Sequence, residues 1–337
     1  MITGAENMNK KDRVYRALRG EPVDRVPVTF CTHFANSEDN TVKETVKWTK
    51  ESGVDLTDVG CDGFYALWSE KPLKTIEDWL AFRPYRRDDP FVALQVDRAK
   101  RISEALQDDA SVFCSAFTPM SNFKHTLGEV FNENQETLVM EFWNEHRKDV
   151  LQVLKVLEET NFILLEALSE TGADGVGISL QQAERWRFSR EDYQEYMLPF
   201  DQRLLDFAKE HFRSHYVHLC SWGTENTNES IYLDLYQDLK TDTINWGVHQ
   251  RNSMSMHDGR AFFKNAKAVM GGFDRSREGV LYKGSRENIK RFTKDLIRET
   301  GDQGFILSAD CSIAPGLPTE HIQWVVEAAE EYAAENR

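Results

Sequence analysis

The feature of this sequence that most constrains its fold is a regular alternation between short apolar runs and longer segments with helical periodicity. Several runs are almost continuously apolar, which is typical of parallel strands that are buried on both faces. The expected strands are Val26–Cys31, Val54–Gly60, Ser111–Phe117, Gly175–Leu180, Tyr216–Cys220, Thr243–Gly247, Ala268–Phe273 and Gly304–Ala309. Between them, apolar residues at helical spacing predict helices that include Met140–Ala167, Ser189–Arg213, Ser285–Thr300 and Thr319–Ala334. Ser285 and Thr319 stand where helix N-caps are expected.

Eight strands that alternate with helices predict an α/β fold, a single (β/α)8 barrel. A doubly wound sheet gives a similar alternation, but no glycine-rich dinucleotide motif follows the first run. The 337 residues contain no linker, repeat or low-complexity tract, so one domain is expected to span residues 1–337. In a barrel, chemistry belongs at the carboxyl ends of the strands.

Charge and hydropathy exclude several classes of partner. The chain has 41 Lys and Arg against 56 Asp and Glu, a net charge of −15, and shows no basic stripe for a nucleic acid. No run approaches the roughly 18 apolar residues of a membrane span. The polar N-terminus lacks the apolar core of a signal peptide. We therefore expect a cytoplasmic protein that binds neither nucleic acid nor membrane.

The five cysteines are widely scattered and odd in number, which argues against a disulfide framework. His218 and Cys220 lie two residues apart at the end of an expected strand, on one face of it, and Cys311 lies just beyond the last expected strand. One imidazole and two thiolates suit zinc, and three protein ligands leave a fourth position for water or substrate. The alternative is that these cysteines are ordinary buried thiols.

Other polar residues near the expected strand ends are candidates for the same site, and some of them have an ordinary structural role as the alternative. Glu184 is a candidate carboxylate near the metal or a solvated partner of a neighbouring arginine, and Asp62 is a candidate general acid or base or a turn residue. Asp274 is a candidate to orient His218 or a substrate amide. We expect pocket-lining or substrate-binding roles for Cys31, His33, Gln181, Gln182 and Trp222. Asp310 is a candidate to support a metal ligand, and Cys61 and Cys114 are expected to pack in the core. His249 and His257 fall in an expected loop, Val248–Gly259.

Four segments resemble the uroporphyrinogen decarboxylase superfamily: Lys10–Val28, Gly172–Val176, Met270–Asp274 and Gly304–Pro318. The resemblance is collinear and covers almost the whole chain. It implies a single (β/α)8 barrel and two kinds of activity, tetrapyrrole decarboxylation and cobalamin-dependent methyl transfer. The methyltransferases of the methylcobalamin:coenzyme M type carry a zinc motif, His-x-Cys followed later by Cys, which the resemblance places at His218, Cys220 and Cys311.

Two departures from the family pattern bear on the activity. True uroporphyrinogen decarboxylases carry arginine in the loop after the first strand, whereas this loop, residues 30–36, has none. Eight substrate carboxylates need cationic partners, so the loop is badly suited to that substrate. The family motif usually continues with glycine, but Ser221 and Trp222 follow Cys220 here, which suggests a different methyl donor or acceptor.

Three hypotheses follow from the residues and the resemblance. The leading one is a zinc-dependent methyltransferase that moves a methyl group between a corrinoid and a small-molecule substrate or thiol acceptor. The chain has no Asp-x-His-x-x-Gly corrinoid motif, so the corrinoid is expected on a separate protein. The alternatives are a metal-free decarboxylase that depends on Asp62, and a barrel that binds a ligand or partner without turnover.

Overall fold

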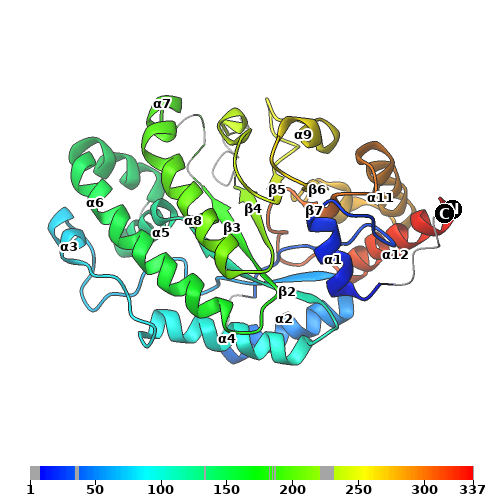
Figure 1. The fold of residues 1–337 in the computed structure, drawn as a ribbon, viewed down its shortest axis with the longest axis horizontal. Coiled ribbons are helices and arrows are strands. Elements are labelled where there is room, and N and C mark those ends of the chain that lie inside the picture. The colour runs from blue at the N-terminus through cyan, green and yellow to red at the C-terminus, as the bar shows by residue number, and fades with distance from the viewer. Residues whose placement is uncertain are drawn as a thin grey trace.

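The structure is a computed structural model that describes residues 8–34, 38–132, 134–181, 183, 185, 187–220 and 231–336. Seven parallel strands form one curled sheet in which neighbours along the chain are neighbours in the sheet (Figure 1). They are β1 (Leu56–Val59), β2 (Ser111–Phe117), β3 (Gly175–Leu180), β4 (His215–Leu219), β5 (Thr243–Trp246), β6 (Ala268–Phe273) and β7 (Phe305–Ala309). Each corresponds to an expected run to within two residues at either end, so the parallel α/β architecture is confirmed.

The first expected strand, Val26–Cys31, is not formed as a strand. It makes two isolated bridges, from Val28 to Leu307 in β7 and from Thr29 to Leu56 in β1. Pro27 lies in this segment and has no N–H to donate, which limits the ladder that the segment can make. The described sheet therefore has seven strands rather than eight, and a short bridging segment contacts both of its edge strands.

Helices follow the strands and cover the outer face of the sheet (Figure 1). Expected helices correspond to α6 (Gln135–Ser169), α11 (Arg286–Thr300) and α12 (Thr319–Glu335). The others are α1 (Lys10–Leu18), α2 (Glu38–Ser52), α3 (Ile76–Ala81), α4 (Pro90–Leu106), α5 (Pro119–Phe131), α9 (Met256–Phe262) and α10 (Val280–Lys283), with a 3₁₀ turn at Leu233–Tyr236. Ser285 caps α11 as expected, but the cap position of α12 is Pro318, so the expectation for Thr319 was wrong.

The expected helix Ser189–Arg213 is interrupted. It consists of a short turn, α7 (Arg190–Asp192), a π-helical turn at Tyr193–Met197, and α8 (Leu198–His211). Pro199 lies in the first turn of α8, where its missing N–H removes one backbone hydrogen bond. Inside the interruption, the Tyr193 hydroxyl donates to Asp201 at 2.6 Å, a buried pair that lies away from the cavity described below.

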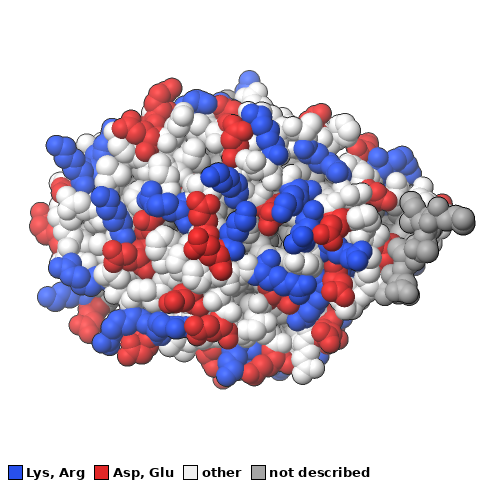
Figure 2. All heavy atoms as spheres, viewed as in Figure 1, with Lys and Arg blue, Asp and Glu red and all other residues white. Residues whose placement is uncertain are grey.

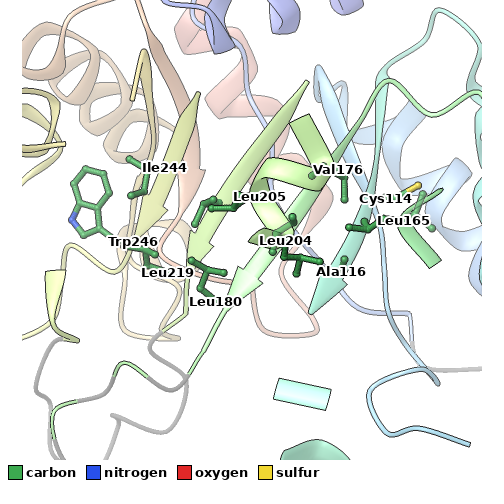
Figure 3. Packing of buried hydrophobic residues seen from close by; sticks show 14 of the residues in the cluster. Cys114, Ala116, Leu165, Val176, Leu180, Leu204, Leu205, Leu219, Ile244 and Trp246 are labelled. Carbon is green, nitrogen blue, oxygen red and sulfur yellow. The ribbon is translucent and has the colours of Figure 1, made fainter. Parts of the chain in front are cut away.

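The main core lies between the sheet and the surrounding helices. Leu204 and Leu205 of α8 lie over the β3 region that carries Val176, and Ile244 and Trp246 extend the same apolar layer along β5 (Figure 3). Because successive strand residues face opposite sides, the alternate residues of these strands face the interior of the curled sheet. Those interior residues form the site.

Helix α1 closes the amino-terminal end of the sheet interior. Its Val14, Ala17 and Leu18 belong to a second buried cluster. The other members of that cluster come from five strands: Leu56, Phe113, Tyr216, Met270 and Ile306. The interior is thus filled at the amino-terminal end, and space for a ligand remains toward the carboxyl ends of the strands.

A buried ion-pair network fastens α1 to the rest of the fold. Asp55, whose side chain is fully buried, accepts hydrogen bonds from Arg13 Nη1 at 2.7 Å and from Arg25 Nη1 at 2.7 Å. It also accepts from the backbone N–H of Val28 at 2.9 Å. Asp24 accepts from Arg13 Nε and Nη2 at 2.6 and 2.7 Å. The network joins α1, the bridging segment and the start of β1.

The face of the molecule shown in Figure 2 carries charges of both signs. Basic and acidic side chains alternate there without a broad patch of one sign (Figure 2). Within the described part of the chain, no helix has the length and apolar character needed to cross a membrane.

Candidate metal centre

Two strand ends bring an imidazole and two thiols together. His218 lies in β4, Cys220 follows that strand directly, and Cys311 follows β7. Their candidate ligand atoms all lie within 4.8 Å of one another. The structure therefore assembles the three residues that the sequence spacing singles out, at the carboxyl edge of the sheet, and all are at least partly buried.

Asn245 in β5 fixes the tautomer of His218. Its Nδ2 donates to the carbonyl oxygens of Met270 at 2.8 Å and Ala309 at 3.1 Å, which turns its Oδ1 toward His218, 2.5 Å from Nδ1. Because an amide oxygen can only accept, Nδ1 of His218 carries the proton and Nε2 bears the lone pair. That Nε2 is buried and makes no hydrogen bond to a nitrogen or oxygen atom of the described residues. A lone pair held beside two thiols fits a metal ligand.

The electrostatics of the cluster favour a thiolate. A hydrogen bond with Cys220 lowers the pKa of the Cys311 thiol well below its usual range, and the nearby His218 adds to this against the opposing effect of burial. Burial lowers the pKa of His218, but the charge of Cys311 and the hydrogen bonds outweigh it and raise that pKa overall. The donor set of one neutral imidazole and two thiolates is one that zinc prefers.

A cavity of about 380 Å³ opens beside this cluster and extends into the sheet interior. Small inward residues, namely Ser115 in β2, Gly177 and Ser179 in β3 and Ser308 in β7, leave the space that larger side chains fill in most barrels. At Gly177 a Cβ atom would lie 2.3 Å from the Tyr216 ring, so the glycine is needed for that ring to cross the interior. The volume suits a small molecule.

One part of the cavity wall is aromatic. Tyr65, Phe117 and His125 contact one another, with ring centroids 5.3 to 5.6 Å apart. None of the residues that line the cavity, all within the described ranges, is lysine or arginine. The cavity is therefore apolar on one side, thiol-rich at its edge and without lysine or arginine among its described lining residues.

Cys31 and His33 both line this cavity, where the sequence places them. Asp62 holds His33, with Oδ1 3.0 Å from Nδ1, and its Oδ2 accepts from the backbone N–H of Phe34 at 2.8 Å. The hydrogen bond to Asp62 raises the pKa of His33 despite the burial of the imidazole. Asp62 itself is buried behind His33 and does not line the cavity, so it contacts His33 rather than a ligand in this structure.

The interior also holds an acidic residue that the sequence reasoning missed. Asp58 in β1 lines the cavity and accepts a hydrogen bond from the Tyr216 hydroxyl at 2.6 Å. Burial raises the pKa of Asp58 to about 6, and the bond from Tyr216 acts in the opposite direction. Its signal in the sequence is an acidic residue within the expected strand Val54–Gly60, a signal that Asp58 shares with Asp55.

Three other residues considered from the sequence, Asp274, Asp310 and His257, do not line the cavity. Asp274 accepts from the backbone and the hydroxyl of Ser276, both at 2.8 Å; Asn245, not Asp274, meets Nδ1 of His218. Asp310 contacts His249, whose Nδ1 lies 2.9 Å from Oδ2. His257 lies in α9 rather than in a loop, because that helix begins at Met256.

The remaining cysteines differ from one another. Cys61 lines the cavity as well as being buried, whereas Cys114 packs in the core on the helix-facing side of β2 (Figure 3). Burial raises the pKa of both thiols to about 12, so neither is a ready thiolate. Three further candidates, Gln182, Glu184 and Trp222, lie outside the described residues.

A parallel α/β sheet with polar side chains gathered at its carboxyl edge and a closed amino-terminal end is the arrangement of barrel-type enzymes. The chain belongs to the uroporphyrinogen decarboxylase (URO-D) family, whose sequence profile matches residues 68–332.

Known proteins of two activities are similar to this chain. A methylcobamide:CoM methyltransferase, MtbA, from Methanosarcina acetivorans is 24% identical over 363 residues, covering 96% of this chain and 98% of its own length. A uroporphyrinogen decarboxylase from Aquifex aeolicus is 22% identical over 360 residues, with 96% and 99% covered. The solved structure of a methyltransferase from Methanosarcina mazei has the same fold, with a TM-score of 0.71, 17% identity, and 96% and 99% of the two chains covered.

Proposed function

We propose that this protein is a zinc-dependent methyltransferase that moves a methyl group between a corrinoid protein and a small-molecule substrate or thiol acceptor. The observation that carries the proposal is the cluster of His218, Cys220 and Cys311, with the lone pair of His218 Nε2 fixed by Asn245. The similarity to a methylcobamide:CoM methyltransferase supports methyl transfer that involves a corrinoid.

The residues of the chain have defined tasks in this reaction. His218 Nε2 and the two sulfur atoms would hold zinc and leave one position for the substrate. When bound, zinc supplies positive charge that lowers the pKa of a coordinated thiol and keeps it as a nucleophilic thiolate near neutral pH. Asn245 holds the imidazole in the ligating tautomer, and the walls of the cavity exclude water from the reacting sulfur.

The corrinoid reaches the site from outside. A cavity of about 380 Å³ suits a small molecule, and the chain has no Asp-x-His-x-x-Gly motif for binding a corrinoid itself. A separate corrinoid protein would dock at the carboxyl edge of the sheet. When docked there, the corrinoid would supply an electrophilic methyl group and would keep the bonding electron pair, while the cavity would hold the substrate sulfur in line and the thiol proton would pass to solvent.

Porphyrinogen decarboxylation fits the cavity less well. An octacarboxylate needs several cations around it, whereas the described lining residues include no lysine or arginine. The described part of the first loop, residues 30–34, also carries none.

Metal removal tests the proposed function directly. We expect freshly purified protein to contain about one zinc per chain and to transfer the methyl group of methylcobalamin to a small thiol. Dialysis against a chelator should abolish the transfer, and one equivalent of zinc should restore it. Metal-free protein that retains full methyl transfer, or that decarboxylates uroporphyrinogen under reducing conditions, would contradict the proposal.

Replacing Asn245 tests how the imidazole is held. Asn245→Ala removes the acceptor that fixes Nδ1 of His218, so we expect zinc affinity to fall about 10- to 100-fold. Competition with a chromophoric chelator measures the affinity. Unchanged circular dichroism should accompany the loss, and an affinity within about twofold of the parent protein would show that the orientation of His218 does not depend on this bond.

A further inference from the structure

Asp58 is a partly buried acid in the wall of the cavity, with one carboxylate oxygen that no described residue engages. Asp58 Oδ1 accepts from the Tyr216 hydroxyl at 2.6 Å, and within the described residues Asp58 makes no second side-chain hydrogen bond. Asp58 lines the cavity, so Oδ2 is available to a ligand inside it. Such a group needs a hydrogen-bond donor when the cavity is filled, because an unpaired buried carboxylate oxygen is costly.

The pair lies one layer below the candidate metal centre. Tyr216 and His218 are two residues apart in β4, which separates their Cα atoms by about 7 Å and directs their side chains to the same face. The side chains of Tyr216 and His218 line the same cavity. His218 is also close enough to Asp58 to lower the pKa of its carboxyl group. A substrate whose sulfur lies at the metal centre would therefore extend a short tail toward Asp58.

The direction of the tail follows from the shape of the interior. The corrinoid must approach the reacting sulfur from the open carboxyl edge, because α1 closes the other end. A substrate tail that pointed outward would occupy the space that the corrinoid needs. The tail must therefore extend inward, toward Asp58 and Tyr216.

We propose that Asp58, positioned by Tyr216, binds the tail of the small-molecule substrate, and that this tail is an ammonium or hydroxyl group rather than an anion. The inference rests on the proposed function and names its substrate class. A sulfonate or carboxylate tail would meet the Asp58 carboxylate in a cavity with no lysine or arginine among its described lining residues. An ammonium tail would form a charge-assisted hydrogen bond there.

Arg275 offers a different position for an anionic tail. It is half-buried in the segment after β6 and lies close enough to lower the pKa of both Cys311 and His218. It is not among the residues that line the cavity. A tail bound by Arg275 would lie at the rim, on the side where the corrinoid arrives, so the test must separate the two positions.

Three thiols of equal length separate the charge classes: 2-aminoethanethiol, 2-mercaptoethanol and 2-mercaptoethanesulfonate, with their three-carbon counterparts as a second set. Their binding to the cobalt(II)-substituted protein is followed by the thiolate-to-cobalt absorption bands at pH 7.5. We expect the aminothiol to bind at least about tenfold more tightly than the sulfonate, the effect of one charge-assisted hydrogen bond. Equal binding, or tighter binding of the sulfonate, would overturn the inference without any variant being needed.

Two matched variants assign the preference to Asp58. Asp58→Asn keeps the shape and removes the charge, so we expect the preference to shrink to within about threefold. Asp201→Asn changes another buried aspartate that accepts from a tyrosine at 2.6 Å but lies outside the cavity, and it should keep the full preference. If Asp58→Asn has no effect while Arg275→Gln abolishes sulfonate binding, the tail lies at the rim and the inference is wrong.

The outcomes also distinguish this inference from the proposed function. If no thiol changes the cobalt spectrum, the metal centre does not bind thiols and the proposed function fails. If all three thiols bind with similar affinity, the proposed function stands and the inference alone fails.

Discussion

Cys311→Ser should remove zinc from the protein and reduce methyl transfer by at least about 1,000-fold, on the order of 4 kcal/mol in the activation barrier. Cys311 supplies one of three donor atoms that lie within 4.8 Å of one another, and a hydroxyl is a much weaker ligand than a thiolate for this metal. Without zinc, the positive charge that would keep the substrate thiol deprotonated is also lost. Metal content by elemental analysis and the rate of methylcobalamin demethylation measure the two effects.

The ligands should act as a unit. Cys220→Ser is expected to reduce zinc content and the rate of methyl transfer as much as Cys311→Ser does. The double variant should lose little more, because the first substitution already destroys the metal centre. Cys114→Ala is the matched control: this cysteine is buried on the helix-facing side of β2 and should retain about one zinc and near-parental activity. Full zinc occupancy in both serine variants would show that the metal, if present, is bound elsewhere.

Asp55→Ala should destabilise the protein by about 3 to 5 kcal/mol, the usual effect of breaking a buried ion pair. The change leaves Arg13 and Arg25, both nearly buried, without the carboxylate to which each donates at 2.7 Å. It also removes the acceptor for the backbone N–H of Val28. Urea denaturation, followed by circular dichroism, should show a lower midpoint.

An exposed aspartate provides the comparison. Asp88 pairs with Arg86 at 3.4 Å, and both side chains are more than three-quarters exposed. Solvent screens such a pair, so Asp88→Ala should change the free energy of unfolding by less than about 1 kcal/mol. Equal effects of the two substitutions would mean that the network around Asp55 does not fasten α1 to the sheet.

The sequence predicts the strands well because parallel strands that are buried on both faces consist of nearly continuous apolar runs. The spacing of His218 and Cys220, followed by a cysteine after the last strand, predicts the cluster because strand ends converge at one edge of the sheet. Where the pattern is ambiguous, local chemistry decides. Pro27 leaves the first expected strand with only two bridges, and Pro199 coincides with the interruption in the expected helix Ser189–Arg213.

Contacts across the interior of the sheet are harder to predict. The bond between Asn245 and His218 depends on the register of β4 against β5, and the bond between Asp58 and Tyr216 joins residues 158 positions apart. No periodicity in a single sequence specifies such pairs. The sequence does show that Asn245 and Asp58 are polar residues within apolar runs, which is unusual. It does not show which residues they hydrogen-bond to.

The closure of the interior by α1 has a kinetic consequence. Under the proposed function, the small molecule and the corrinoid protein would share the open carboxyl end, so their order of arrival would be constrained. The small molecule would then enter before the corrinoid protein docks, and its product would leave only after that protein has departed. The proposed enzyme would therefore follow an ordered mechanism, in which the larger partner binds last and leaves first.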